Sequence, residues 1–98
     1  MVTKIRWTEK ANKDLDSIAE YLETEWNSRV KRNFVKLLIS KLDLISIFPN
    51  LGSQILHPKI IKSILITKHS RLYYRVNKNQ IIILRIYDTR KDPKKFKL

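Results

Sequence analysis

The sequence contains no cysteine among its 98 residues, which excludes disulfide bonds and metal sites built from thiolates. It contains no run of about 18 apolar residues, the length that a membrane-spanning helix needs. The first ten residues, MVTKIRWTEK, lack the apolar segment of a signal peptide. Internal repeats, linkers and low-complexity segments are also missing. We therefore expect one cytoplasmic domain over residues 1–98, with no metal and no cofactor.

Acidic residues are scarce in the second half of the chain. Residues 1–50 carry nine Lys/Arg against seven Asp/Glu, whereas residues 51–98 carry twelve against two, and the net charge is +12. A small domain typically carries a net charge of about 2–8. The asymmetry indicates an anionic partner, either nucleic acid or an acidic protein, although a basic surface kept for solubility is the plainer alternative. A membrane partner is disfavoured, because no basic amphipathic helix with exposed aromatic residues is present.

The first half of the chain changes from strand periodicity to helix periodicity. Residues 3–8 alternate as in a half-buried strand, and residues 9–25 then carry one apolar stripe at helical spacing, with Thr8 as N-cap. A second helix begins after Asn27 or Ser28 and runs to Phe48. Because only one or two residues join the two helices, they must form an antiparallel hairpin. The tryptophans Trp7 and Trp26 are both expected in the core.

The second half reads as a loop followed by strands. We expect a loop over 53–59, strands over 61–68 and 70–76, a hairpin turn over 77–80 and a last strand from Gln80. The segment QIIILRIY is apolar on both sides, which is typical of an interior strand. The helices would cover the sheet face formed by Leu72, Tyr74, Ile82, Leu84 and Ile86. The opposite face would carry Arg71, Tyr73, Arg75, Arg85 and Tyr87. The order β-α-α-β-β-β predicts an α+β fold of two layers, an antiparallel sheet with the N-terminal helical hairpin on one face.

Three segments resemble one protein superfamily. They are Trp7-x3-Ala11-x3-Leu15-x2-Ile18-x2-Tyr21, then Phe48-Pro49-x2-Gly52, and finally Tyr74-Arg75-Val76 followed after a turn by Ile83-Leu84-Arg85-Ile86-Tyr87-Asp88-Thr89-Arg90. Their content and order are similar to the RelE/ParE superfamily of toxins over essentially the whole chain. The resemblance implies the toxin of a bacterial type II toxin–antitoxin pair, neutralised by a small antitoxin with which it forms a hetero-oligomer. RelE-like members cut mRNA on the ribosome, whereas ParE-like members poison DNA gyrase, and the sequence leaves both targets open.

The mRNA-cleaving alternative requires groups that stabilise phosphate charge and transfer protons without a metal. The guanidinium of arginine can donate two parallel hydrogen bonds to phosphate oxygens, and histidine commonly transfers protons in catalysis. A tyrosine ring can stack on a base that is turned out of its own stack. The candidate catalytic residues are Arg75, Arg85, Arg90, Tyr87 and His69. Two of them also have a structural interpretation: Arg85 would pair with Asp88 or with an antitoxin carboxylate, and His69 would be a surface residue at a turn. In the tail, Phe96 stands where some nuclease members carry tyrosine, and it cannot move a proton.

The gyrase alternative needs no catalytic group, because a docking surface on the helical hairpin and the tail would suffice. The long helices and the spacing of Asp14, Leu15, Ile18 and Tyr21 favour this ParE-like alternative. A third possibility is a non-toxic basic nucleic-acid-binding module, although no helix-turn-helix, RNP or zinc signature is present. Residues expected to bind the target or nucleic acid are Lys68, Arg71, Tyr73, Lys91, Lys94 and Lys95. An acidic and apolar antitoxin segment is expected to cover Tyr73, Arg75, Arg85 and Tyr87.

Overall fold

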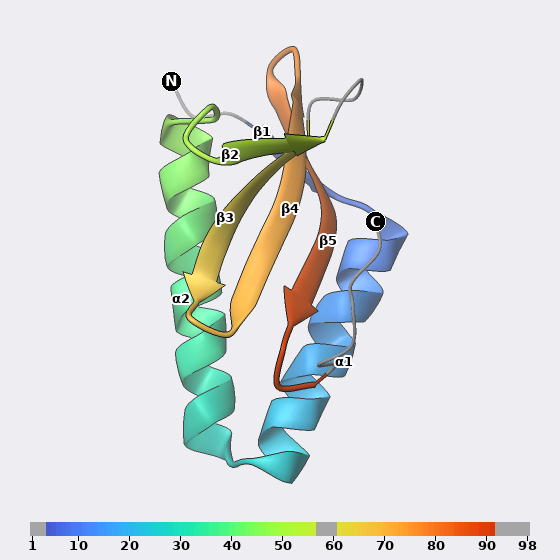
Figure 1. Ribbon diagram of the computed structural model, residues 1–98, viewed down its shortest axis with the longest axis vertical. Helices are drawn as coiled ribbons and strands as arrows, with labels where there is room; N and C mark the ends of the chain where they lie inside the picture. The colour runs from blue at the N-terminus through green and yellow to red at the C-terminus, as the bar shows by residue number, and fades with distance from the viewer. Residues whose placement is uncertain (1–3, 57–60, 92–98) are drawn as a thin grey trace.

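The computed structural model describes residues 4–56 and 61–91, and it has the expected two-layer α+β architecture (Figure 1). One layer is a five-stranded sheet and the other is the helical hairpin. In chain order the elements are β1 (Lys4–Trp7), α1 (Glu9–Glu25), α2 (Ser28–Ile47), β2 (Ser53–Leu56), β3 (Ile61–Thr67), β4 (Ser70–Asn77) and β5 (Gln80–Asp88).

Side-chain caps define where both helices begin, as predicted. The hydroxyl of Thr8 accepts a hydrogen bond from the backbone N–H of Ala11 at 3.1 Å, and the amide oxygen of Asn27 accepts one from the N–H of Val30 at 2.9 Å. Each bond satisfies a backbone donor that the first helical turn leaves without a partner. Trp26 and Asn27 alone separate the helices, so the chain reverses at once into the hairpin.

The strand order β1-β5-β4-β3-β2 differs from the prediction at both edges of the sheet. β1 pairs with β5 in parallel, so the expectation of a wholly antiparallel sheet is wrong there. A tight turn would force antiparallel pairing, but a helical hairpin follows β1 and leaves either direction open. At the other edge, β2 pairs with β3 inside the segment predicted as a loop. The prediction that β5 is an interior strand is confirmed, since β1 and β4 flank it.

A β-bulge in β5 changes which residues face the helices. Tyr73 pairs with Arg85 and Tyr74 pairs with Ile83, so Leu84 has no opposite residue on β4. An extra residue reverses the alternation of side chains on one side of it. The helix-facing core therefore contains Ile81, Ile83 and Ile86, and the prediction that Ile82 and Leu84 face the helices is wrong. The hydroxyl of Thr8 hydrogen-bonds the carbonyl oxygens of Ile83 and Leu84 at 2.9 and 3.2 Å, which ties the start of α1 to the bulge.

The two tryptophans occupy different environments. Trp7 packs against the core as predicted. Trp26 is 54% exposed, so the prediction that it lies in the core is wrong. Its apolar spacing continues the stripe of α1, but it is the C-cap residue of that helix and lies in the short connection to α2. The guanidinium carbon of Arg90 lies 5.9 Å from its ring centroid, a distance typical of a cation–π contact.

The buried hydroxyl of Tyr74 closes the connection between α2 and β2. It donates a hydrogen bond to the carbonyl oxygen of Pro49 and accepts one from the N–H of Gly52, both at 2.9 Å. Burial raises the pKa of Tyr74, an effect that the Gly52 N–H partly opposes, so the hydroxyl keeps the proton that it donates. A Cβ atom on Gly52 would lie 2.7 Å from this hydroxyl oxygen and 2.9 Å from the carbonyl oxygen of Ser63. Glycine is therefore required here by close approach.

Replacing Gly52 by alanine should lower the free energy of unfolding by about 1–3 kcal/mol, because the added methyl group must displace packed atoms. Tyr74→Phe should cost a similar amount by leaving a buried N–H without its acceptor. The double variant should cost less than the sum, since removing the hydroxyl relieves the closest contact of the new methyl group. Urea denaturation of all three variants measures this coupling. Strict additivity would show that the contact does not constrain residue 52.

Candidate binding surfaces

The strand register gathers five of the predicted site residues on the sheet face that the helices leave uncovered. Tyr73 pairs with Arg85, and Arg71 pairs with Tyr87, so these four lie in two adjacent cross-strand rows. Arg75 pairs with Ile82 in the next row. A guanidinium nitrogen of Arg71 also donates to the hydroxyl of Ser63 at 2.8 Å. These arginines and tyrosines therefore lie close together on β4 and β5, as predicted. Their use as a binding site depends on which arginines are already paired with carboxylates of the protein.

Arg85 forms a bidentate ion pair with a carboxylate on α1. Its Nε lies 2.7 Å from Oδ2 of Asp14, and its Nη2 lies 3.1 Å from Oδ1. Oδ2 of Asp14 also accepts the backbone N–H of Ile86 at 3.0 Å. The hydrogen bond from Asp14 raises the pKa of Arg85, and partial burial opposes this. The partner of Arg85 is thus Asp14, and the alternative that it pairs with Asp88 is wrong.

Arg90 is held by the carboxylate of Asp88, whose side chain is fully buried. The backbone N–H, Nε and Nη2 of Arg90 donate to Asp88 at 2.8, 3.2 and 2.9 Å. The hydroxyl of Tyr21 on α1 donates to the carbonyl oxygen of Arg90 at 2.6 Å. Together with the contact to Trp26, these bonds fasten the exit of β5 to the helical hairpin. The charge of Arg90 is therefore part of the fold.

The remaining predicted residues lie apart from one another. Lys68 and His69 form the turn between β3 and β4, and both line a groove on the α2 side of the sheet. Lys91 lies instead beside Asp14 and Arg85, at the end of β5. Lys94, Lys95 and Phe96 lie outside the described residues. The structure therefore separates His69 from the sheet face that carries Arg71 and Tyr73.

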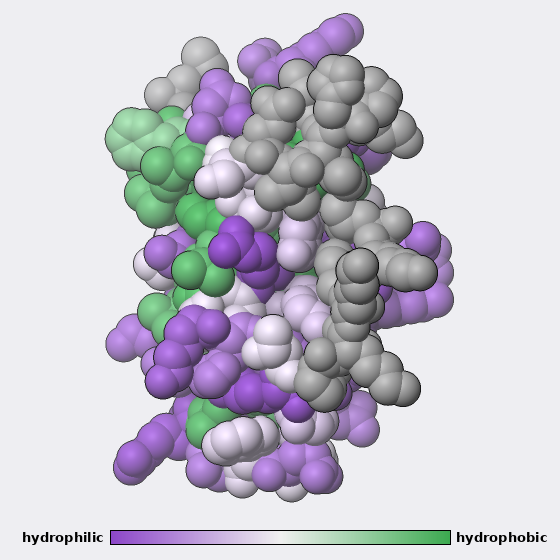
Figure 2. Space-filling view, in the orientation of Figure 1, coloured by the Kyte–Doolittle hydropathy of each residue, from purple (hydrophilic) through white to green (hydrophobic). Residues whose placement is uncertain are grey.

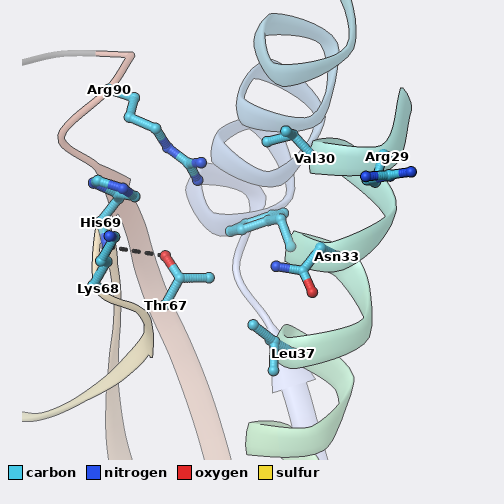
Figure 3. A pocket seen from close by; sticks show the side chains of 9 residues that line it. Arg29, Val30, Asn33, Leu37, Thr67, Lys68, His69 and Arg90 are labelled. Atoms are coloured by element: carbon cyan, nitrogen blue, oxygen red, sulfur yellow. Dashed lines mark hydrogen bonds between the residues drawn. The ribbon is translucent and has the colours of Figure 1, made fainter. Parts of the chain in front are cut away.

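The groove between α2 and the β3–β4 turn has a volume of about 600 Å³ (Figure 3). Val30, Phe34 and Leu37 on α2 supply its apolar wall, and Thr67, Lys68, His69 and Arg90 line the opposite side. Phe34 belongs to the hydrophobic core, and Val30 and Leu37 pack against it, so the groove borders the core. Their spacing of four and three residues does mark one side of the helix, but nothing local shows that the sheet leaves part of that side uncovered.

The outward side of α2 forms a second exposed surface, which we call the α2 outer face. Arg32 and Lys36 are exposed along its first half, next to Arg29, which is exposed and also lines the groove. Large apolar side chains follow towards its end and are at least half exposed: Ile39 53%, Ile47 58%, Phe48 57% and Leu51 50%. Figure 2 shows apolar side chains gathered over the end of α2 and its connection to β2. A soluble monomer rarely exposes a contiguous apolar patch of this kind without a binding role.

Within residues 4–56 and 61–91, no group of three or more His, Asp or Glu side chains is arranged to hold a metal ion. No helix in this part of the chain is both long and apolar enough to cross a membrane.

Replacing Arg85 or Asp14 by alanine should each lower the free energy of unfolding by about 1–3 kcal/mol, because charge-assisted hydrogen bonds are lost in a partly buried site. The pair Glu9 and Lys13 offers a matched control, with side chains 84% and 75% exposed. Its coupling energy should not exceed about 0.5 kcal/mol. Double-mutant cycles by urea denaturation measure both. Equal coupling in the two pairs would show that Asp14 and Arg85 do not support the fold.

Comparison with known proteins identifies the family. The model of a family described as the ParE toxin of the type II toxin-antitoxin system parDE matches residues 5–93. Among solved structures, the chromosomal ParDE toxin–antitoxin system from P. aeruginosa is similar, with a TM-score of 0.73 and 20% identity over 89% of this chain and 96% of that one. No curated protein sequence matches the chain.

Two RelE-type structures share the fold as well. The RelBE2 toxin–antitoxin complex from Mycobacterium tuberculosis has a TM-score of 0.59 and 18% identity over 90% of this chain and 99% of that one. A double arginine mutant of E. coli toxin RelE in the free state has a TM-score of 0.60 and 18% identity over 95% and 90%. Identities this low show a common fold alone. The family match, in contrast, spans nearly the whole sequence, and this chain belongs to the ParE toxin family of type II toxin–antitoxin systems.

Proposed function

We propose that this toxin arrests growth by binding DNA gyrase through the α2 outer face, and that a small acidic antitoxin neutralises it. Residues 1–98 would act as a single toxin domain in the cytoplasm. The family match supports the toxin role, and the ParDE and RelBE2 structures are those of toxins with antitoxins. We choose gyrase over mRNA as the target because two arginines that an mRNA-cleaving site would need are already ion-paired within the protein.

The observation that carries the proposal is that the two arginines of the β5 exit are engaged within the protein. Arg85 is bound to Asp14, and Arg90 is bound to Asp88. A phosphate at either guanidinium would have to compete with a carboxylate that is already fixed at 2.7–2.9 Å. Breaking such a partly buried pair also leaves its carboxylate without a cation. A mechanism that needs both cations at a phosphate is therefore disfavoured, whereas docking through another surface requires no change in either pair.

The α2 outer face suits docking to a large protein. Its basic half, with Arg29, Arg32 and Lys36, provides long-range attraction to an acidic surface, and its apolar end provides area that binding can remove from water. The Tyr74 hydroxyl holds the connection that carries Phe48 and Leu51, so these side chains are presented on a fixed backbone. Preorganisation of this kind lowers the entropic cost of association.

The mRNA-cleaving alternative keeps one observation in its favour. The uncovered sheet face brings two tyrosines and two arginines into adjacent rows, namely Tyr73, Tyr87, Arg71 and Arg85. Aromatic rings beside guanidinium groups are the arrangement that stacks a base and holds its phosphate. His69, the candidate proton carrier, lies in the groove on the α2 side, which separates the proposed acid–base group from these rings.

The first experiment compares DNA and RNA damage by the same protein. Purified toxin mixed with gyrase and plasmid should give linear DNA after detergent and protease treatment, because a docked poison traps the cleaved complex. Brief expression in cells should leave mRNA intact by primer extension. Discrete cuts within translated codons, with no gyrase-linked DNA breaks, would instead establish the nuclease alternative.

Charge reversal on the α2 outer face should weaken gyrase association. The variant Arg32→Glu with Lys36→Glu should bind gyrase at least about tenfold more weakly, since two favourable long-range attractions become repulsions. The matched control is Lys4→Glu with Lys78→Glu, which makes the same change in net charge at exposed positions outside α2. Surface plasmon resonance on immobilised gyrase measures both. Equal weakening by the two variants would mean that net charge alone attracts the toxin and that this face is not the docking site.

A further inference from the structure

One stripe of side chains on the α2 outer face combines positive, apolar and negative groups. Its members follow one another at steps of four, three, four and four residues, which places them within about 80° of arc on the helix. They are Arg32, Lys36, Ile39, Asp43 and Ile47, and all five are exposed. Figure 1 shows α2 along one edge of the molecule. The stripe is therefore accessible to a partner over about four turns of the helix.

Asp43 is the member of the stripe that a gyrase-docking surface does not explain. An acidic partner would be attracted by the basic first half of the stripe but would repel a carboxylate between Ile39 and Ile47. Neither Asp43 nor Lys36 forms an ion pair among the described residues. No residue of opposite charge lies three or four positions from either of them in α2, the spacing at which helical side chains pair. Both charges are therefore available to a partner.

The order of these groups is complementary to itself when a second α2 lies antiparallel against the first. The midpoint between Lys36 and Asp43 falls beside Ile39. A twofold axis through that point places each Lys36 opposite the partner's Asp43 and brings the two Ile39 side chains together at the centre. Packed helices lie about 8–10 Å apart, a separation that a lysine and an aspartate side chain can bridge together. A symmetric contact of this kind closes at two copies.

We propose that two copies of this chain associate through this stripe in an antiparallel α2–α2 contact, with two Lys36–Asp43 ion pairs around a central pair of Ile39 side chains. The apolar end of each stripe then lies against the basic first half of the other. There the hydrocarbon stem of the partner's Arg32 can cover Ile47 while its guanidinium stays in water. A single pair of helices makes a small interface, so the association is weak and reversible.

The net charge of +12 on each copy opposes this association without preventing it. At physiological ionic strength, exposed charges more than about 8 Å apart are largely screened from one another. The antiparallel contact brings two pairs of opposite charges together within that distance. Most other cations of the two copies lie farther apart than this, because they are distributed over the rest of each molecule. The local attraction therefore acts nearly in full, whereas the overall repulsion is weakened by salt.

The dimer would conceal the surface that docks on gyrase under the proposed function. This consequence rests on the proposed function, whereas the self-association itself does not. Arg32 and Lys36 cannot meet gyrase while they lie against a second copy, so the monomer alone would dock. The α2 outer face would thus limit the activity of the toxin as its concentration rises.

The test exchanges the charges of the proposed ion pair. Lys36→Glu and Asp43→Lys should each raise the dissociation constant of the dimer at least about tenfold, because each variant places like charges opposite one another at two points. An equimolar mixture of the two variants should associate within about threefold of the wild type, since the mixed dimer again contains two pairs of opposite charge. Sedimentation equilibrium of the full-length proteins measures all of these constants. Mixing cannot rescue a variant that is merely misfolded.

The controls are Lys4→Glu and Asp16→Lys, which make the same changes in charge at exposed positions outside α2. Each should leave the dissociation constant within about threefold of the wild type, and mixing them should change nothing. A wild type that stays monomeric up to about 1 mM would overturn the inference. A dimer that both α2 variants leave intact, or a mixture that associates no better than its components, would overturn it as well.

Gyrase binding separates failure of this inference from failure of the proposed function. On immobilised gyrase, the rate of wild-type binding should rise less steeply once the toxin concentration exceeds the dissociation constant of the dimer, whereas Asp43→Lys should keep a linear rise. A linear rise for a dimerising wild type would overturn the concealment of the docking surface. If the toxin dimerises and never binds gyrase, the dimer stands and the proposed function fails. If it binds gyrase and never dimerises, only this inference fails.

Discussion

The position of α1 against the sheet depends on the carboxylate of Asp14. β1 pairs with β5 only as far as Ile83, so beyond that residue β5 has an open backbone edge. Asp14 closes this edge by accepting the N–H of Ile86 and the guanidinium of Arg85. Unpaired backbone N–H groups at a strand edge destabilise the fold when they are buried, and they can pair with another protein chain when they are exposed. Asp14 prevents both outcomes at Ile86 because its carboxylate accepts the backbone N–H. The register between helix and sheet, and with it the location of the β5 exit, follows from this contact.

Asp14 and Asp88 neutralise arginines at the end of β5, and few carboxylates are left to neutralise the other cations. The chain has 9 acidic residues against 21 basic ones, and Asp14 and Asp88 are both committed to arginines that fasten β5 to the helices. Arg90 lines the groove and is paired with Asp88, whereas Lys68 in the groove and Arg32 and Lys36 on the α2 outer face form no ion pair among the described residues. An acidic partner therefore gains attraction at surfaces whose own geometry need not change. Among the described residues, the exposed cations without an ion pair thus include those on α2 and on the β3–β4 turn beside it.

Local features of this fold could be predicted from the sequence, and features that depend on distant residues could not. Thr8 and Asn27 cap helices through atoms three residues away, so their pattern is visible in a short window. The bulge at Leu84 depends on its pairing with β4 and on the hydroxyl of Thr8, 76 residues away, and a periodic run of isoleucines contains no sign of it. Likewise, Arg85 can be taken for a phosphate-binding residue from the sequence alone. Its ion pair with Asp14, 71 residues away, is visible only in the folded protein. The site prediction located the right strands but could not show which cations the fold itself uses.

The groove and the α2 outer face lie so close together on one helix that an occupant of the first can obstruct access to the second. Asn33 on the groove side and Lys36 on the outer face lie within one helical turn, where Cβ atoms three residues apart are about 5–6 Å from each other. A bound helical segment has a diameter of about 10 Å, so it would extend beyond the groove over the flank of α2. Any helical segment bound in the groove would therefore obstruct a large partner approaching Arg32 and Lys36. Exclusion by shared space needs no conformational change in the toxin, which agrees with a fold whose sheet and hairpin are joined by fixed ion pairs.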